Sequence, residues 1–235
     1  MNYHNNTVGV IGGLGPMATV YFLNMVVSLT KSITDQGHID MLISNKSTTP
    51  DRTDFIIGKS TLNPAPVLNK EALKLQNAGA DFLVMTCNTA YYFYYEIIEN
   101  VNIPFINIIE ETVIHAKNKG FKKLCILATT GNIQTKLYQS MCKKHGLNFL
   151  VPNEEQQKIV MDIIYGHIKK GIKPNIDIFH SLIFDFKKKQ CDGAILGCTE
   201  LSILKNDFNL CEDFFIDSLE VLARKTIELC GKKSI

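Results

Sequence analysis

The chain has 235 residues, of which 46% are hydrophobic and 20% are charged, and its formal net charge is only +2 at pH 7. This balance is typical of a soluble globular protein with a substantial core and excludes a disordered chain. The lysines are spread without a basic stripe, so neither nucleic acid nor a membrane surface is expected as a partner. A small charged ligand is favoured instead. The first seven residues lack the basic start of a signal peptide, and no run approaches the about 18 apolar residues of a membrane span.

The seven cysteines are an odd number, and none forms a Cys-x-x-Cys pair, so neither a zinc site nor a disulfide framework is indicated. The six histidines also lack paired ligand spacing, and no metal site is expected. Free thiols favour a reducing, cytoplasmic environment. Five cysteines lie in apolar or amphipathic segments and are expected to be small buried side chains: Cys125, Cys142, Cys191, Cys211 and Cys230.

Strand and helix patterns alternate along the first half of the chain, which predicts a mainly parallel sheet flanked by helices. Pro16 is placed to open the first helix, and Gly79 is placed to end the second. A polar loop is expected at 45–53. Strands are predicted at 7–11, 39–44, 81–86 and 103–108, and helices at 17–33, 67–77, through 91–95, and over a segment ending near 120.

The pattern then restarts, because the strand and small-residue turn that begin at Lys123 resemble those at Thr7, about 116 positions earlier. A pseudo-repeat of half the chain is the simplest account. We expect an α/β protein of two pseudo-symmetric three-layer domains, 1–109 plus 216–235 and 110–215, with a small-molecule site in the cleft between them. The second half is predicted to hold strands at 123–128, 148–151, 193–196 and 214–216, and helices at 133–144, 155–169, 176–188 and 219–229.

Two short motifs repeat across these halves. In each, an Asp starts an apolar strand that ends six residues later at a cysteine, Cys87 or Cys198, before a predicted helix. The carboxyl end of a parallel strand is where α/β sheets place ligand chemistry. A thiol at a helix N-terminus is expected to have a lowered pKa, suited to a nucleophile or to a proton-transfer base. Proton transfer explains the duplication better, since a base and an acid on opposite faces of one carbon would invert it; two buried structural cysteines are the alternative.

The glycine turn at Gly13-Leu-Gly15-Pro-Met-Ala18 formally matches a dinucleotide-binding pattern. That pattern also requires an acidic residue at the end of the next strand, where this chain has Ser44-Asn45-Lys46. The mismatch argues against a nucleotide. Either the turn brings backbone N–H groups to a substrate carboxylate, or it is a tight turn and nothing more.

Several motifs together resemble the aspartate/glutamate racemase family that works without pyridoxal phosphate, and most closely its aspartate racemase branch. The resemblance covers nearly the whole chain in the right order. It rests on Gly12-Gly-Leu-Gly-Pro16 with Ala18-Thr19, Pro50-Asp51-Arg52, Cys87-Asn88-Thr89-Ala90, Leu127-Ala-Thr-Thr-Gly131 and Gly197-Cys198-Thr199-Glu200.

This resemblance implies that Cys87 and Cys198 are the two catalytic acid/base thiols and that the reaction needs no cofactor. It implies an acidic amino acid as the small-molecule partner, with interconversion of L- and D-aspartate as the reaction and glutamate as a further candidate substrate. It also implies a homodimer. The residues implied in substrate binding are Asp51, Arg52, Thr53, Asn88, Thr89, Ala90, Lys169 and Thr199.

One departure from the family is Tyr91, because members commonly have a histidine after Cys-Asn-Thr-Ala. Two alternatives stay open: another carbon acid as substrate, such as a hydantoin or maleate, or a binding protein for acidic amino acids without turnover. The aromatic run 91–95 lacks the basic neighbours of a nucleic-acid site, so we expect it to pack on the core and at a subunit interface.

Overall fold

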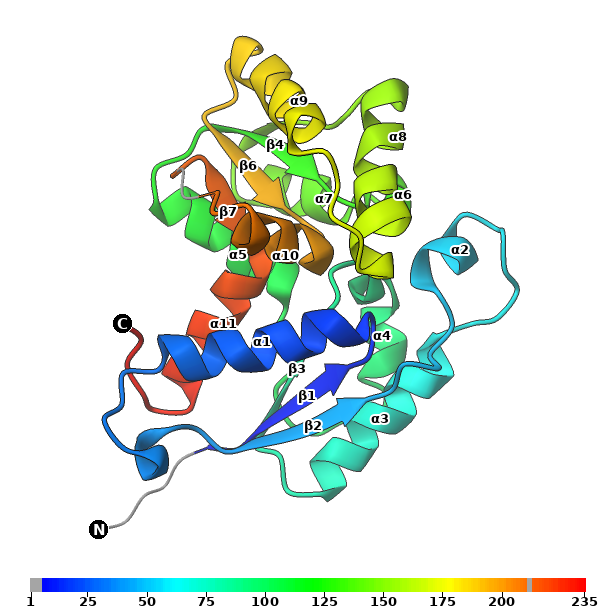
Figure 1. Cartoon of the computed structure of the whole chain (residues 1–235). Coiled ribbons are helices and arrows are strands. Elements are labelled where there is room, and N and C mark those ends of the chain that lie inside the picture. The colour runs from blue at the N-terminus through cyan, green and yellow to red at the C-terminus, as the bar shows by residue number, and fades with distance from the viewer. Residues whose placement is uncertain (1–5, 211–212) are drawn as a thin grey trace.

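Two parallel β-sheets, one above the other in Figure 1, organise the chain. The computed structural model describes residues 6–210 and 213–235. The lower sheet has the strand order β2-β1-β3 and the upper sheet the order β5-β4-β6-β7, and every pairing is parallel. The predicted α/β class is therefore confirmed. The strands are β1 (Val8–Gly12), β2 (Met41–Asn45), β3 (Phe82–Met85), β4 (Lys123–Leu127), β5 (Asn148–Leu150), β6 (Gly193–Leu196) and β7 (Phe215–Asp217).

The pseudo-repeat is visible in the strand order, because β1 lies between β2 and β3 as β4 lies between β5 and β6. The aspartates of the two repeated motifs accept equivalent hydrogen bonds in the two sheets. Asp81 accepts a hydrogen bond from the amide of Thr7 at 2.7 Å, and Asp192 accepts from the amides of Lys122 and Lys123 at 2.7 and 2.9 Å. Each carboxylate thus fixes the start of the neighbouring strand, and its own strand then runs to a cysteine at the opposite edge of the sheet.

Helices cover the sheets on both faces, with α3 against the lower sheet and α8 and α9 beside the upper one (Figure 1). The last helix, α11, leaves the upper sheet and packs on α1 and α5. The helices are α1 (Pro16–Leu29), η1 (Asp35–Gly37), α2 (Arg52–Ile56), α3 (Ala65–Asn77), η2 (Thr89–Phe93), α4 (Tyr94–Ile97), α5 (Ile108–Asn118), α6 (Thr130–Gln134), α7 (Leu137–Lys144), α8 (Glu154–Met161), η3 (Asp162–His167), η4 (Ile168–Lys170), α9 (Ile176–Lys188), α10 (Thr199–Asp207) and α11 (Ser218–Leu229).

The core forms two hydrophobic clusters that meet at β4, because successive side chains of a strand point to opposite faces. Leu124 and Ile126 belong to the cluster that includes β1, β3, α1 and α11, whereas Cys125 and Leu127 belong to the cluster beneath α9 and α10. The two halves therefore share a core. The division into 1–109 plus 216–235 and 110–215 remains a proposal, and position 216 falls inside β7, so the return to the lower sheet begins with α11.

The prediction of an extended strand at 103–108 is wrong. Only Phe105 forms a bridge, parallel to Leu83, through two hydrogen bonds of 2.8 and 2.9 Å. Pro104 has no N–H group for the ladder, and the side chain of Asn107 accepts from the amides of the next helix, α5, whose first residue is Ile108. This segment occupies the place that β7 holds in the upper sheet.

Three other predicted elements differ from those observed. The helix expected at 133–144 is interrupted, because Lys136 adopts a left-handed conformation with φ of 57° between α6 and α7. The helix expected at 155–169 changes from α8 to the wider π-helical turn η3 and then to the tighter 3-10 turn η4. The aromatic run 91–95 forms a 3-10 turn followed by a four-residue helix. Such irregular helices are frequent at functional sites.

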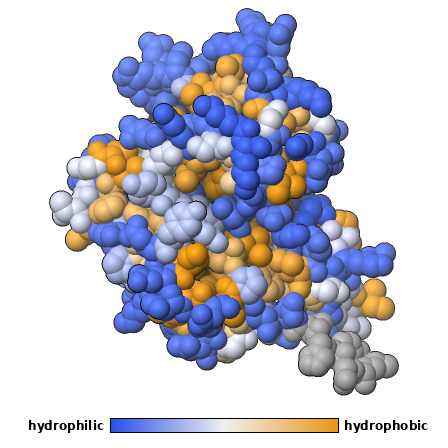
Figure 2. Space-filling model, turned by 180° about the vertical axis from the view of Figure 1, so that it is seen from behind, coloured by the Kyte–Doolittle hydropathy of each residue, from blue (hydrophilic) through white to orange (hydrophobic). Residues whose placement is uncertain are grey.

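Of the five cysteines predicted to be structural, four are buried and free, and Cys211 lies outside the described residues. Seen from behind, the surface is mostly hydrophilic, with hydrophobic patches gathered mainly on the lower half (Figure 2). Across 6–210 and 213–235, no helix has the length and apolar character required to cross a bilayer.

Candidate active site

Cys87 and Cys198 line the same small cavity between the two halves of the chain. Each follows a strand, β3 or β6, whose carboxyl end faces this cleft, and the exposed fractions of the two cysteines are only 7% and 6%. The cavity volume is about 10 Å³, which is roughly the room that one water molecule needs. An amino acid therefore enters only if the cleft opens. The cavity is lined by Leu14, Arg52, Thr53, Cys87, Asn88, Thr89, Thr129, Tyr165, Lys169, Cys198, Thr199 and Glu200.

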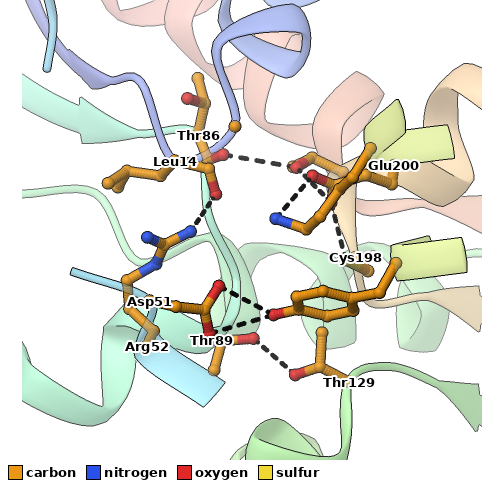
Figure 3. Close-up of polar contacts among 12 residues, drawn as sticks. Leu14, Asp51, Arg52, Thr86, Thr89, Thr129, Cys198 and Glu200 are labelled. Atoms are coloured by element: carbon orange, nitrogen blue, oxygen red, sulfur yellow. Dashed lines mark hydrogen bonds and ion pairs between the residues drawn. The ribbon is translucent and has the colours of Figure 1, made fainter. Parts of the chain in front are cut away.

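Arg52 lies at the first turn of α2 and is buried beside Cys87. Its guanidinium donates to the carbonyl of Leu14 at 2.5 Å (Figure 3) and to that of Pro50 at 3.0 Å, and these two bonds fix its plane. Burial alone would lower the pKa of Arg52. The nearby charges of Cys87 and Asp51 raise it by more than burial lowers it, so the net shift is upward and the group stays protonated. Its Nε has no hydrogen-bond partner in the described part of the chain, which leaves a buried donor for a carboxylate.

Cys198 is the N-cap residue of α10, and its thiol donates a hydrogen bond of 2.9 Å to Oε2 of Glu200. The other carboxylate oxygen, Oε1, forms an ion pair of 3.2 Å with Lys169. Burial and the charge of Glu200 raise the pKa of Cys198 well above its ordinary value. The lowering expected from the helix N-terminus is therefore wrong for this thiol, because desolvation and a neighbouring carboxylate outweigh the helix dipole.

One contact at this cavity joins the two halves. The hydroxyl of Tyr165, on η3, lies 3.1 and 3.2 Å from the carboxylate oxygens of Asp51, which caps α2 (Figure 3). Burial and the charge of Asp51 raise the pKa of Tyr165, so the phenol keeps its proton and donates it. The ammonium of Lys169, one turn further along, lies 4.8 Å from the centre of the Tyr165 ring. The hydroxyl of Tyr165 thus holds the upper half against the lower one, while Lys169 packs on the Tyr165 ring within the upper half.

Asn88, Thr89 and Ala90 follow Cys87 and differ in what they present to the cavity. The amide of Asn88 is engaged in the core, since it donates to Ser218 at 3.1 Å and accepts from Tyr138 at 2.6 Å. Thr89 lines the cavity and shares a hydrogen bond of 2.8 Å with Thr129 across the cleft. Ala90 is fully buried and does not line the cavity.

The glycine turn before α1 places Leu14 at the cavity. Gly13 has a positive φ of 85°, and a Cβ there would collide with the backbone of Lys46. The amide of Gly13 is taken by the hydroxyl of Thr19 at 2.9 Å, so this amide is not free for a ligand. The carbonyl of Leu14 accepts from Arg52. In this geometry the turn positions an arginine.

The cavity is also lined by four residues that were not among the predicted site residues, namely Leu14, Thr129, Tyr165 and Glu200. The sequence could have indicated Glu200, because an acidic residue two positions after a cysteine at a helix start can reach back to the thiol. Tyr165 lies four residues before Lys169, which places both on one face of a helix.

Tyr91, which stands where a histidine is common in the family, does not line the cavity. Its ring is buried, and its hydroxyl donates to the carbonyl of Ile106 at 2.6 Å. The ring packs on Phe105 with centroids 5.6 Å apart. This residue therefore holds the 104–106 segment against the sheet.

A larger hollow of about 840 Å³ lies beside α11 and contains neither cysteine. Its charged side chains pair with one another, since Lys205 and Arg224 both contact Glu220, at 2.9 and 3.0 Å. Volume alone therefore does not identify the reactive site.

The model of a known family, Asp/Glu/Hydantoin racemase, matches residues 11–226. The chain belongs to the Asp/Glu/hydantoin racemase family. Residues 11–226 include both cysteines and the cavity between them, so the membership applies to the whole site.

Relatives of known structure share the fold of this racemase family over almost the whole chain. The aspartate racemase of Picrophilus torridus is 29% identical, covers 98% of this chain and 96% of its own, and superimposes with a TM-score of 0.86. A glutamate racemase of Francisella tularensis, solved in complex with D-glutamate, has the same fold at 18% identity and a TM-score of 0.67, covering 97% and 81%. The broad specificity amino-acid racemase RacX of Bacillus subtilis is 26% identical over 94% of this chain and 96% of its own.

Proposed function

We propose that this chain is a cofactor-independent amino-acid racemase that interconverts L- and D-aspartate by two-base proton transfer between Cys87 and Cys198. The observation that carries the proposal is that two thiols from equivalent strand ends line one cavity together with Arg52 and Lys169. Two positive groups between two proton carriers suit a small dianionic carbon acid. The aspartate racemase of Picrophilus torridus, similar over nearly the whole chain, supports aspartate as the first substrate to test.

The hard step is removal of the Cα proton, which is very weakly acidic beside a carboxylate. Negative charge builds on that carboxylate as the proton leaves, and preorganised cations in a closed site stabilise it. Two cations line the cavity for this role: Arg52, whose buried Nε has no nitrogen or oxygen partner among the described residues, and Lys169, whose ammonium also pairs with Glu200. Burial lowers the pKa of each of these two groups, whereas the negative groups beside them raise it. The net effect raises both pKa values, so Arg52 and Lys169 remain cationic.

Inversion then requires one proton on the pair of thiols. The thiolate of one cysteine takes the Cα proton from one face, while the thiol of the other gives its proton to the opposite face. The C–H bond broken on one side is replaced by a C–H bond formed on the other, and the pair ends with its proton on the other sulfur. Oriented binding by Arg52 aims the breaking bond at a sulfur, and the closed cavity excludes water from the carbanion.

A panel of L-amino acids tests this proposal, with loss of optical rotation as the readout and chiral chromatography of the product as confirmation. Aspartate is expected to racemise fastest, with glutamate next, because one methylene changes the fit by only about 1–3 kcal/mol. Deuterium incorporation at Cα in heavy water separates an enzyme from a binding protein. If no amino acid in the panel loses rotation or takes up deuterium, the proposal fails.

A second candidate is a racemase of wider specificity, favoured by the printed name of the relative from Bacillus subtilis. The same panel decides between the two, since aspartate would then be one of several substrates with comparable kcat/KM. If the substrate is instead a hydantoin or maleate and a thiol of the enzyme attacks it as a nucleophile, a covalent adduct forms on Cys87 or Cys198. Mass spectrometry of the trapped enzyme detects this adduct.

We also propose a cytoplasmic homodimer. The aromatic run supports an interface, because Tyr92 and Tyr95 are 49% and 84% exposed while Tyr91 and Phe93 are buried in the core. Tyrosine is enriched at the centre of interfaces. Sedimentation of the purified chain at micromolar concentration tests this, and the double change Tyr92→Ser with Tyr95→Ser is expected to shift a dimer toward monomer. A wild-type monomer at that concentration removes the proposal.

A further inference from the structure

Glu200 connects the two chemical groups on the Cys198 side of the cavity (Figure 3). It is buried at 4% exposure on the first turn of α10. Oε2 accepts from the Cys198 thiol at 2.9 Å and from the Thr199 hydroxyl at 3.4 Å, while Oε1 pairs with Lys169 at 3.2 Å. A carboxylate oxygen only accepts hydrogen bonds, so the contact with Cys198 requires the proton to lie on sulfur.

The environment of Cys87 has the opposite sign. The guanidinium of Arg52 interacts with Cys87 and carries hydrogen-bond donors only. Around Cys198, by contrast, the titratable and charged groups are Glu200, Lys169, Cys87 and Tyr165. Lys169 is the one cation among these four, and its ammonium is engaged by Glu200. The two thiols thus face different partners although their strands are equivalent.

We propose that Glu200 is a positioning residue that keeps Cys198 in its thiol form, so that the closed site holds a thiolate at Cys87 and a thiol at Cys198. This inference rests on the proposed two-base function, which needs one proton shared between the thiols, and it assigns that proton. The raised pKa of Cys198, caused by burial and by the charge of Glu200, agrees with the hydrogen-bond geometry. The free enzyme is therefore prepared to take the Cα hydrogen that faces Cys87. The reverse reaction starts from the less populated form, with the proton on Cys87.

The charge state of each thiol is measurable without turnover. The wild-type protein is treated with iodoacetamide over a range of pH, and the alkylation of each cysteine is followed by mass spectrometry of its own peptide. Because only a thiolate reacts, the midpoint of rate against pH reports the thiol's ionisation, whereas opening of the cleft scales the rate at every pH. The midpoint for Cys87 is expected to lie below that for Cys198. The reverse order would overturn the proposal.

Glu200→Gln then tests the cause, because the side chain keeps its shape and loses its charge. The midpoint for Cys198 is expected to fall by at least about one pH unit, which means about tenfold more thiolate at a given pH below it. Glu71→Gln is the matched control, since Glu71 is also buried, bonds to Ser44 at 2.5 Å and pairs with Lys74 at 3.4 Å, outside the cavity. This control is expected to leave the Cys198 midpoint in place.

An unchanged Cys198 midpoint in a folded Glu200→Gln variant would contradict the role of Glu200. If that variant does not fold, the wild-type order of the two midpoints still decides where the proton lies. These measurements are also independent of the substrate. A chain that racemises nothing in the amino-acid panel would refute the proposed function, and the thiol titrations would still confirm or refute this inference.

Discussion

The hydroxyl of Tyr165 lies 3.1 and 3.2 Å from the two carboxylate oxygens of Asp51, and this contact joins segments that are 114 residues apart. Tyr165 lines the cavity from the upper half, and Asp51 caps α2, whose first residue, Arg52, lines it from the lower half. Together with the ion pair between Lys169 and Glu200, it fastens η3 and η4 over a cavity of about 10 Å³. Opening of the cleft between the two halves must therefore break the contact between Tyr165 and Asp51, and closing must remake it.

Tyr165→Phe removes this contact and keeps the ring. A hydrogen bond to a charged group is worth about 1.5–3 kcal/mol, so the closed form should lose about that much relative to the open form. We expect the KM for the amino-acid substrate to rise roughly tenfold or more, with a smaller change in kcat because no proton carrier is altered. Steady-state kinetics in both directions measure this effect.

The matched control is Tyr95→Phe, which removes a hydroxyl from an exposed ring outside the cavity. It is expected to leave KM unchanged. A Tyr165→Phe enzyme with wild-type KM would show that the contact with Asp51 does not help to close the cleft.

Cys87→Ala and Cys198→Ala each remove one proton carrier. General acid-base groups contribute about 10²–10⁴-fold to a rate, so racemisation should fall by at least that range in either variant. A single remaining thiol can still exchange the Cα hydrogen on its own side without inversion. Deuterium exchange and chiral chromatography on the same sample separate the two outcomes.

The control for these variants is Cys142→Ala, because Cys142 is fully buried in the core and does not line the cavity. Its activity per folded molecule is expected to match the wild type. Near-full racemisation by either Cys87→Ala or Cys198→Ala would refute the two-base mechanism.

Arg52→Lys keeps the positive charge and loses the planar fork. The guanidinium is fixed by the carbonyls of Leu14 and Pro50, and a lysine cannot donate to both while presenting a further donor to a substrate. Loss of one preorganised donor in a closed site costs about 10²–10³-fold in rate, and we expect a fall of that order in kcat/KM for aspartate. Arg224→Lys, at a surface ion pair with Glu220, is the control. Equal activity of Arg52→Lys and wild type would exclude the proposed grip on the carboxylate.

The fold was largely predictable because hydrophobic period and turn residues agree along the chain. The bounds of β6 and α9 equal those predicted, 193–196 and 176–188, and the matching cysteine motifs predicted a shared cleft. Prediction failed where one residue redirects the backbone, as Pro104 and Asn107 do in the 103–108 segment. The hydrophobic pattern of a short segment cannot show whether its residues extend a strand or cap the next helix.

The site was less predictable, because its contacts depend on how the two halves meet. Tyr165, which contacts Asp51, lies on the π-helical turn η3, and no local motif predicted this turn. The effect of the helix N-terminus on Cys198 was expected to dominate, but burial is a property of the whole fold and it reverses the direction of the pKa shift.

His115 should make stability depend on pH. Burial, and then the charge of Lys119, lower its pKa in the folded state, so the unfolded chain binds the proton first as the pH falls. The free energy of unfolding should therefore decrease as the pH falls below about 6.5, the ordinary value. In His115→Asn, the decrease between pH 7.5 and 5.5 in urea titrations should be smaller than in wild type. His180→Asn, at an exposed position, should follow the wild type.

Tyr91→Phe tests whether the residue that replaces the family's common histidine acts in catalysis or in packing. Its hydroxyl donates to the carbonyl of Ile106 at 2.6 Å, and removal leaves a buried acceptor without this partner. That loss costs about 1–3 kcal/mol, so the free energy of unfolding in urea should fall by this amount. The ring remains, and it lies outside the cavity. We therefore expect kcat and KM of the folded variant to stay within about twofold of wild type, well below the 10²–10⁴-fold that an acid-base group contributes. A variant of wild-type stability and greatly reduced kcat would instead make this phenol part of the proton-transfer machinery.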